Sequence, residues 1–319
     1  MRGEDRFRWL SGMVTNMVTD LQPNQGAWNL VLNAQGRIQG DLHVWREGDA
    51  LELEIATDQA ERLLAHFNRF IIMDDVELVP LGVEAAGETA VGLTGPLANE
   101  VLGRLSLPSL SEPLTATRVE WNGLDLRIAR GYGVLAAHYE LWLQSPGLAK
   151  LWKYLRAAGA IPVGSASLEA FRIAEGIPSY GIDIAERDLP QETSQMRALH
   201  FSKGCYLGQE IVERIRSRGS IHRHLRALEI TGPMPAAGAE LFLNDRDVGG
   251  GAAGEKGASA GHITSTAGLA LASGYRVFAL GMIRGEAELR DQPLIYTTGA
   301  ATGTARILAA PPTLNPERT

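Results

Sequence analysis

The sequence predicts an α+β protein in which mixed α/β layers are followed by a small all-β domain. Three observations predict this class. Apolar residues recur at helical spacing near the start, strand-like and helix-like segments then alternate, and from about Arg226 short strand-like runs rich in glycine and proline replace the helical periodicity. The 319 residues allow one large domain or two to three modest ones.

The first predicted element is an amphipathic helix that begins near Asp5, with acidic residues at its start, where the helix dipole favours them. Its apolar residues are Phe7, Leu10, Val14, Met17, Val18 and Leu21. Two strand-like runs follow at Ala27–Leu32 and Arg37–Trp45, and the Asn33–Gly36 segment between them favours a hairpin turn.

The second of these runs has two different faces, because successive side chains of a strand alternate. One face carries Ile38, Gly40, Leu42 and Val44, and the other carries Gln39, Asp41 and His43. A third half-buried strand at Leu51–Ile55 leads into a helix that Thr57 and Asp58 can cap. We therefore expect a sheet covered by helices on one side.

The next part of the chain predicts two more helices and two more strands. A helix at Leu97–Leu105 follows Pro96, a residue suited to a first helical position, and a helix at Leu148–Ala158 ends at Gly159. The strands are predicted at Val119–Arg130 and Tyr139–Leu143.

These segments divide the chain into a mixed region at residues 1–225, built as one unit or as two intertwined subdomains, and an all-β domain at 226–310. Residues 311–319 are expected to form a disordered tail. Gly249–Gly261 is rich in glycine, alanine and serine and predicts a mobile loop between two strands.

Composition excludes several classes of protein. The net charge of −7 argues against a surface coated with nucleic acid, and no apolar run approaches the ~20 residues that cross a bilayer. A single cysteine excludes a disulfide scaffold and fits a reducing compartment, so we expect a cytoplasmic protein. No pair of Cys or His residues has a spacing typical of zinc sites, and we predict no metal ligands.

The only cysteine, Cys205, lies in the segment Lys203–Glu210 (KGCYLGQE). Lys203 would favour the reactive thiolate, and Gly204 and Gly208 would allow the thiol to sit on a tight turn. The alternative is a small buried apolar residue, which is the more common role of a lone cysteine.

This segment resembles the signature of the YgfZ-type folate-binding proteins, relatives of the glycine-cleavage T-protein that are implicated in iron–sulfur cluster assembly and repair. Further similarity lies at Asp5–Thr19, at the predicted hairpin, at Thr94–Pro96 and at Arg172–Asp183. The resemblance implies T-protein-like folate-binding domains around a central cavity and a C-terminal β-barrel. It also implies tetrahydrofolate, or a one-carbon derivative, as the cofactor.

The resemblance assigns roles to two carboxylates. Asp41 falls where the T-protein has the acidic residue that faces the reactive nitrogens of tetrahydrofolate, and Glu140 falls where it has a glutamate that grips the pterin. An ionised carboxylate only accepts hydrogen bonds, and the pterin edge offers adjacent N–H donors. The alternatives are a solvated Asp41 on the hairpin and a Glu140 on the polar face of a strand.

Arginines and histidines crowd the segment Arg214–Arg226. This segment is a solvated face, an anion site for the glutamate tail of folate that includes Arg218, or a docking patch for an acidic partner. It has no interleaved aromatic residues, which argues against binding of single-stranded RNA by base stacking. Tyr206, Gln209 and Glu210 complete the expected cofactor site, and Cys205, Lys203 and Asp41 are the expected catalytic residues.

The sequence and the resemblance together predict a folate-binding accessory protein that supports iron–sulfur enzymes, with client or assembly proteins as partners. One cysteine cannot hold a cluster that needs about four protein ligands, so any cluster role is shared or indirect. The alternative is an aminomethyltransferase that uses Asp41. Val134–His138 differs from the acidic, glycine-rich segment of the T-protein, which disfavours this alternative.

Overall fold

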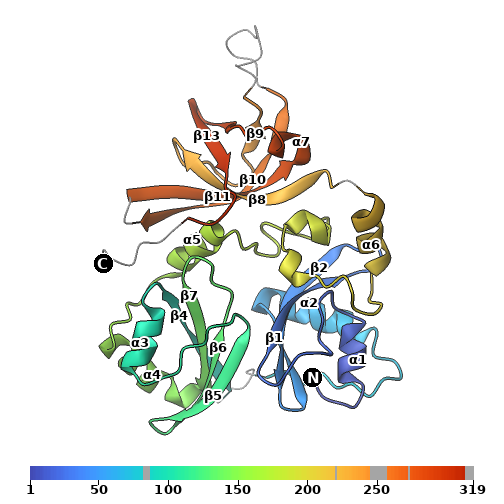
Figure 1. Cartoon of the computed structure of the whole chain (residues 1–319), viewed down its shortest axis with the longest axis vertical. Helices are drawn as coiled ribbons and strands as arrows, with labels where there is room; N and C mark the ends of the chain where they lie inside the picture. The colour runs from blue at the N-terminus through green and yellow to red at the C-terminus, as the bar shows by residue number, and fades with distance from the viewer. Residues whose placement is uncertain (82–86, 220, 245–256, 272–273, 313–319) are drawn as a thin grey trace.

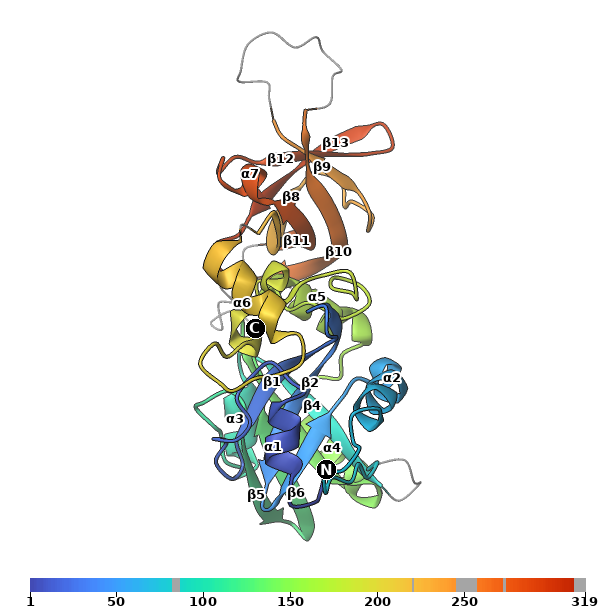
Figure 2. The ribbon, with the colours of Figure 1, turned by 90° about the vertical axis from the view of Figure 1, so that its right-hand side faces the viewer.

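The chain folds into two antiparallel sheets that lie side by side below a closed β-barrel, as the computed structural model shows (Figure 1). The structure describes residues 1–81, 87–219, 221–244, 257–271 and 274–312. Figure 2 shows the barrel at one end of the long axis and the two sheets at the other.

The first sheet has the order β1-β2-β3 and is antiparallel throughout. Its elements are α1 (Arg6–Ser11), β1 (Gly26–Leu32), β2 (Ile38–Glu47), β3 (Ala50–Glu54) and α2 (Thr57–Asn68). The predicted hairpin and the two faces of its second strand are confirmed, because the residues from Ile38 to Val44 alternate between buried and half-buried. The apolar face packs on α1 and α2 through Leu42, Leu63 and Phe67.

The opening helix is shorter than predicted. It ends at Ser11, and the chain then runs beside β1, where Val14 forms a bridge with Val31 and the Thr15 N–H donates to Leu30 O at 3.1 Å. Val14 and Val18 are fully buried, so their spacing reflects contact with the core in an extended segment. Pairing with β1 here outweighs the helical pattern of the sequence. The predicted cap of α2 also differs, because the N-cap residue is Ala56 and the Thr57 side chain makes no capping hydrogen bond.

The second sheet has the order β4-β7-β6-β5. Its strands and covering helices are β4 (Glu88–Gly95), α3 (Ala98–Arg104), β5 (Thr115–Trp121), β6 (Leu124–Arg130), β7 (Ala137–Gln144), η1 (Ser145–Gly147) and α4 (Leu148–Ala157). The single strand predicted at Val119–Arg130 is wrong, because Asn122 and Gly123 adopt φ values of 52° and 70° and close a two-residue hairpin. Helix α3 begins two residues after Pro96.

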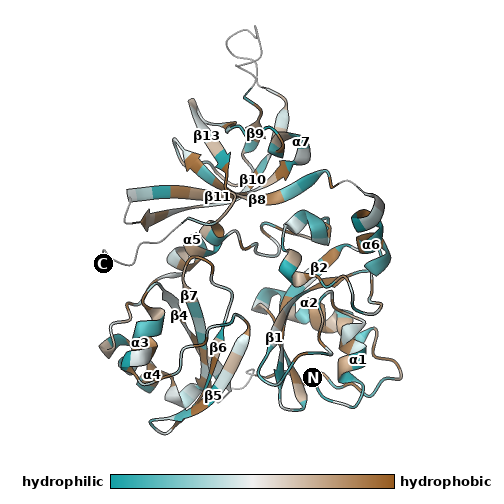
Figure 3. Ribbon diagram, viewed as in Figure 1, coloured by the Kyte–Doolittle hydropathy of each residue, from teal (hydrophilic) through white to brown (hydrophobic). Residues whose placement is uncertain are grey.

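A long connection links the second sheet to the barrel. It contains α5 (Ser165–Glu175), η2 (Pro190–Thr193), η3 (Met196–Ala198) and α6 (Gln209–Arg218). Helix α6 is largely hydrophilic and lies at the side of the molecule (Figure 3). The connection passes over the first sheet, where Ala198, Leu199 and Tyr206 join an apolar cluster that includes Trp28 and Trp45.

The barrel closes in the order β10-β11-β8-β13-β12-β9. Its elements are β8 (Arg223–Thr231), β9 (Glu240–Phe242), β10 (Ser259–Leu271), β11 (Gly274–Arg284), α7 (Gly285–Glu288), β12 (Leu294–Thr298) and β13 (Ala301–Ile307). The closed barrel and the mixed α/β region confirm the predicted fold class, and the predicted boundary at residue 226 falls inside β8.

The predicted loop at Gly249–Gly261 extends too far, because Ser259–Gly261 already pairs with β9. The loop's residues 249–256 and residues 313–319 of the predicted tail lie outside the described residues. In the described part of the chain, no helix combines the length and apolar character that a membrane crossing requires.

Candidate functional site

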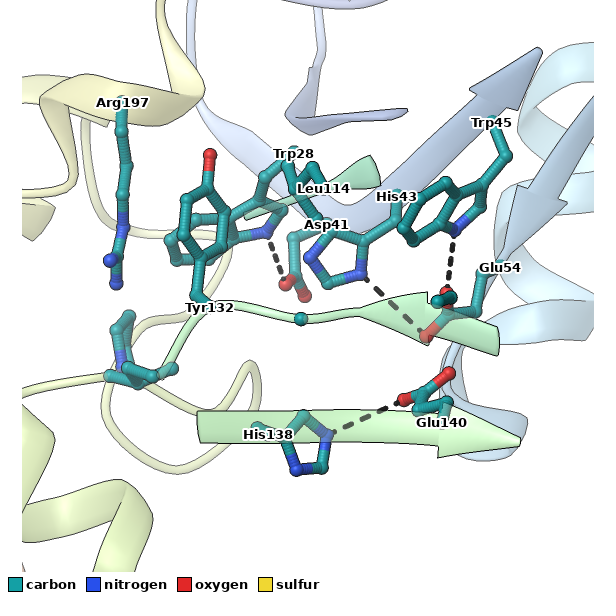
Figure 4. A pocket seen from close by; sticks show the side chains of 14 residues that line it. Trp28, Asp41, His43, Trp45, Glu54, Leu114, Tyr132, His138, Glu140 and Arg197 are labelled. Carbon is teal, nitrogen blue, oxygen red and sulfur yellow. Dashed lines mark hydrogen bonds and ion pairs between the residues drawn. The ribbon is translucent and has the colours of Figure 1, made fainter. Parts of the chain in front are cut away.

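A pocket opens between the two sheets, and its lining comes from segments far apart in the chain (Figure 4). The space between its walls is about 650 Å³ when the open mouth is included. Its lining residues are Trp28, Asp41, His43, Trp45, Glu54, Leu114, Ala129, Gly131, Tyr132, His138, Glu140, Ile177, Pro178 and Arg197. Asp41 and Glu140, the two carboxylates to which the resemblance gave roles, therefore line one cavity.

Asp41 is held in place by two neighbours. The Trp28 indole N–H donates to Oδ2 at 2.9 Å, and Gln59 Nε2 donates to Oδ1 at 3.0 Å. The Asp41 backbone N–H in turn donates to Gln59 Oε1 at 3.1 Å. A Cβ atom at Gly40 would lie 2.6 Å from Gln59 Oε1, so a larger residue there would disturb the contact between Gln59 and Asp41. Asp41 is therefore a half-buried carboxylate with two fixed donors, and not a solvated residue of the hairpin.

Glu140 projects into the pocket from the opposite sheet. Its Oε2 accepts a hydrogen bond of 2.9 Å from the Trp142 indole, and its Oε1 lies 3.8 Å from His138 Nε2. His138, Glu140 and Trp142 share one face of β7 because strand side chains alternate. The carboxylate is half-buried and keeps accepting capacity for a ligand.

Aromatic rings and an unpaired cation form another part of the wall. The Arg197 guanidinium lies over the rings of Tyr132 and Trp28, at 4.3 and 5.2 Å from their centroids. It donates to Gln195 at 3.0 Å, its Nε is buried without a hydrogen-bond partner, and it has no acidic partner among the described residues. Burial lowers the pKa of Arg197. This part of the pocket suits a flat ring and an anionic group.

His43 and Glu54 form an ion pair in the pocket wall, with 3.7 Å between Nδ1 and Oε1. Burial alone would lower the pKa of His43, but its interaction with Glu54 and the charges of Asp41 and Glu140 raise it above the usual value. Burial would raise the pKa of Glu54, yet the interaction with His43 and the hydrogen bond from the Trp45 indole N–H lower it.

Sequence reasoning missed the His43–Glu54 pair, the Trp28 and Tyr132 rings and Arg197. One signal was available, because His43 shares the polar face of β2 with Asp41. No local pattern marks Arg197, which follows Asp41 by more than 150 residues.

The Lys203–Glu210 segment lies on the hairpin turn of the first sheet, outside the pocket lining. Gly208 adopts φ +81° and packs so tightly that a side chain there would lie 2.5 Å from Asn33 O. Gly204 has no positive φ, so only one of the two predicted glycine roles is found. Cys205 is exposed, Gln209 is half-buried and Glu210 is exposed.

Lys203 and Tyr206 face inward. The Lys203 ammonium donates to Val14 O at 2.7 Å and to Asn16 O at 2.6 Å, and it lies 5.2 Å from the centre of the Tyr206 ring. Burial lowers the pKa of Lys203 to about 7 and raises that of Tyr206 to about 12. Lys203 therefore fastens the motif to the amino-terminal segment, and its effect on the thiol stays a prediction.

The predicted basic segment does not form one surface. Arg223 binds Glu192 and Asp188 at 2.8 Å each, and His224 binds Glu288 at 2.8 Å. Arg226 also pairs with Glu288. These contacts join β8 to the connection and to α7, which weakens the idea of a docking patch. Arg218 is the last residue of α6.

Comparison with known proteins places the chain in a family. Residues 1–203, well over half of the sequence, match the family described as "GCVT N-terminal domain", so the chain belongs to this family of glycine-cleavage T-protein-like proteins. A crystal structure of glycine cleavage system aminomethyltransferase T from Bartonella henselae shares the fold, with a TM-score of 0.79 and 19% identity over 97% of this chain and 81% of that one.

Relatives in sequence include a chloroplastic protein of Arabidopsis thaliana that is named as a transferase, 25% identical over 77% of this chain and 57% of the relative. An aminomethyltransferase of Nostoc sp. is 24% identical over 86% of this chain and 73% of its own length. The chain thus spans little more than half of the Arabidopsis relative. The predicted cytoplasmic location stays a prediction.

Proposed function

We propose that the pocket binds tetrahydrofolate or a one-carbon derivative of it. The observation that carries this proposal is the meeting of Asp41 and Glu140 in one cavity with aromatic rings and an unpaired guanidinium. Glu140 would accept N–H groups of the pterin edge, and Trp28 and Tyr132 would flank the ring. Arg197, whose buried Nε has no partner, would take a carboxylate of the glutamate tail.

A calorimetric titration of the purified chain with reduced tetrahydrofolate, under anaerobic conditions, tests this proposal. We expect saturable binding to one site, and we expect Cys205→Ala to bind equally well because Cys205 does not line the pocket. A folded chain that shows no saturable heat at any ligand concentration would contradict the proposal.

The cellular role that we propose is that of an accessory protein for iron–sulfur enzymes, in the YgfZ-type branch of the family. Two observations support it. The KGCYLGQE segment holds the only cysteine, and the structure leaves Cys205 exposed on the surface, where a client protein can reach it. Cys205 would then be the redox-active or ligand-exchanging residue, while the pocket supplies the folate.

The second candidate is an aminomethyltransferase, which is favoured by the names of the relatives and by the clamped position of Asp41. An assay with an aminomethylated lipoyl carrier and tetrahydrofolate separates the two candidates. For the accessory role we expect no turnover, together with protection of an iron–sulfur enzyme against oxidation that Cys205→Ala removes. Turnover that survives Cys205→Ala and disappears in Asp41→Asn would instead establish the transferase.

A further inference from the structure

His43 presents a free ring nitrogen to the pocket. Its Nδ1 faces Glu54, and its Nε2 has no hydrogen-bond partner among the described residues. The ring packs beside Trp28 and Tyr132, with centroid distances of 6.2 and 6.4 Å. Figure 4 shows it between Asp41 and Glu54. A ligand in the pocket would therefore meet Nε2.

Glu54 is itself fixed, so it can orient the imidazole. The Trp45 indole N–H donates to Glu54 Oε2 at 2.8 Å, which leaves Oε1 directed at His43. Trp45 is buried, and the Arg127 guanidinium lies 5.0 Å from the centre of its ring. The orientation of His43 is thus set by β3 and β2 before any ligand arrives.

The groups around His43 accept hydrogen bonds more readily than they donate them. Asp41 lies on the same strand, Glu54 on β3 and Glu140 on β7, and Tyr132 follows β6. The indole N–H groups of this region are already used, since Trp28, Trp45 and Trp142 donate to these three carboxylates. Besides the Tyr132 hydroxyl and the Arg197 guanidinium, which lies over the Tyr132 ring, a protonated His43 is a group beside these carboxylates that can donate to an acceptor atom of the ligand, such as a ring carbonyl oxygen.

We propose that His43 contacts the ligand through Nε2 as a protonated donor, that Glu54 is its positioning residue, and that the pair makes ligand binding dependent on pH. The inference rests on the proposed function, because it takes the ligand to be a pterin that carries an acceptor beside its N–H donors. Protonated imidazole donates from both nitrogens. Neutral imidazole has one N–H, and Glu54 keeps it at Nδ1, so Nε2 loses its proton.

Burial opposes the charged imidazole, but Glu54, Asp41 and Glu140 raise the pKa of His43 above its usual value, so the imidazole stays protonated to a higher pH than an ordinary histidine. Affinity for tetrahydrofolate should be highest below that pKa and should fall as the pH rises through it, by roughly tenfold for one charge-assisted hydrogen bond. In Glu54→Gln the fall should begin at lower pH, because burial then dominates the pKa of His43.

The experiment is a series of anaerobic calorimetric titrations with tetrahydrofolate between pH 6 and 9.5 on the wild type, His43→Gln and Glu54→Gln. We expect His43→Gln to lose the alkaline fall and Glu54→Gln to shift it toward lower pH. His224→Gln, from the His224–Glu288 pair in the barrel, is the matched control and should keep the wild-type profile. Imidazole NMR should show the titration midpoint of His43 moving upward when the ligand saturates the chain.

Two failures are distinguishable. Saturable binding with the same pH profile in the wild type, His43→Gln and Glu54→Gln would overturn the inference and leave the folate site intact. Absence of binding by the folded wild type at every pH would overturn the proposed function, and this inference with it. A simple loss of affinity in Glu54→Gln without a shifted profile would show a structural role only and would also count against the proposal.

Discussion

Replacing Glu140 by glutamine should weaken tetrahydrofolate binding by about 10- to 100-fold. The substitution keeps the size of the side chain and removes the negative charge. A hydrogen bond to a charged group contributes about 1.5–3 kcal/mol, and each 1.4 kcal/mol corresponds to about a tenfold change in affinity. The amide would also present its own N–H groups toward the N–H groups of the pterin edge. Calorimetric titration measures the effect.

The matched control is Glu120→Gln in strand β5 of the same sheet, because Glu120 is exposed and lies outside the pocket lining. We expect Glu120→Gln to bind as tightly as the wild type. Glu140→Gln should unfold at nearly the wild-type temperature, because the glutamine oxygen can still accept the hydrogen bond that the Trp142 indole donates to Glu140. Equal affinity of Glu140→Gln and the wild type would remove Glu140 from the folate site.

The second large effect concerns stability. Asp183 is fully buried as a side chain and joins the connection to the barrel. Its Oδ2 accepts from Arg172 at 2.6 Å and from the Ser179 N–H at 3.0 Å, while its Oδ1 accepts from Thr264 and from Ser265 at 2.7 Å. Asp183→Ala removes the shared acceptor of the Ser179, Thr264 and Ser265 donors, and it takes one of two carboxylate partners from Arg172, which keeps Glu169. We expect a loss of about 3–5 kcal/mol in the free energy of unfolding.

Urea unfolding followed by circular dichroism measures this loss as a lower midpoint. Asp125→Ala serves as the control, because Asp125 pairs with Arg118 at the surface with 63% of its side chain exposed. An exposed ion pair contributes at most about 1 kcal/mol. A midpoint for Asp183→Ala as close to the wild type as that of Asp125→Ala would show that the barrel is held by other contacts.

Local patterns in the sequence were enough for much of the fold. Alternation along Ile38–Val44 and the turn at Asn33–Gly36 predicted the hairpin, because both signals depend only on neighbouring residues. The change of texture near Arg226 predicted an all-β domain for the same reason, and the resemblance made it a barrel. The opening helix was predicted too long because the backbone of Val14 and Thr15 pairs with β1 instead. The local sequence does not show such pairing with a strand that comes later in the chain.

Part of the candidate site was also predicted before the structure, and part of it was not. Resemblance pointed to Asp41 and Glu140, and alternation placed Asp41 on the face opposite Leu42, where the pocket lies. The sequence by itself thus determined the fold class and the hairpin, since both depend on short-range patterns, while the choice of the two carboxylates came from the resemblance and stays a prediction. Only the tertiary structure decided that His43 pairs with Glu54, that Arg197 stands unpaired beside Tyr132, and that Lys203 turns toward Val14. These contacts join residues distant in the chain, and their geometry is set by how the sheets and the connection pack together.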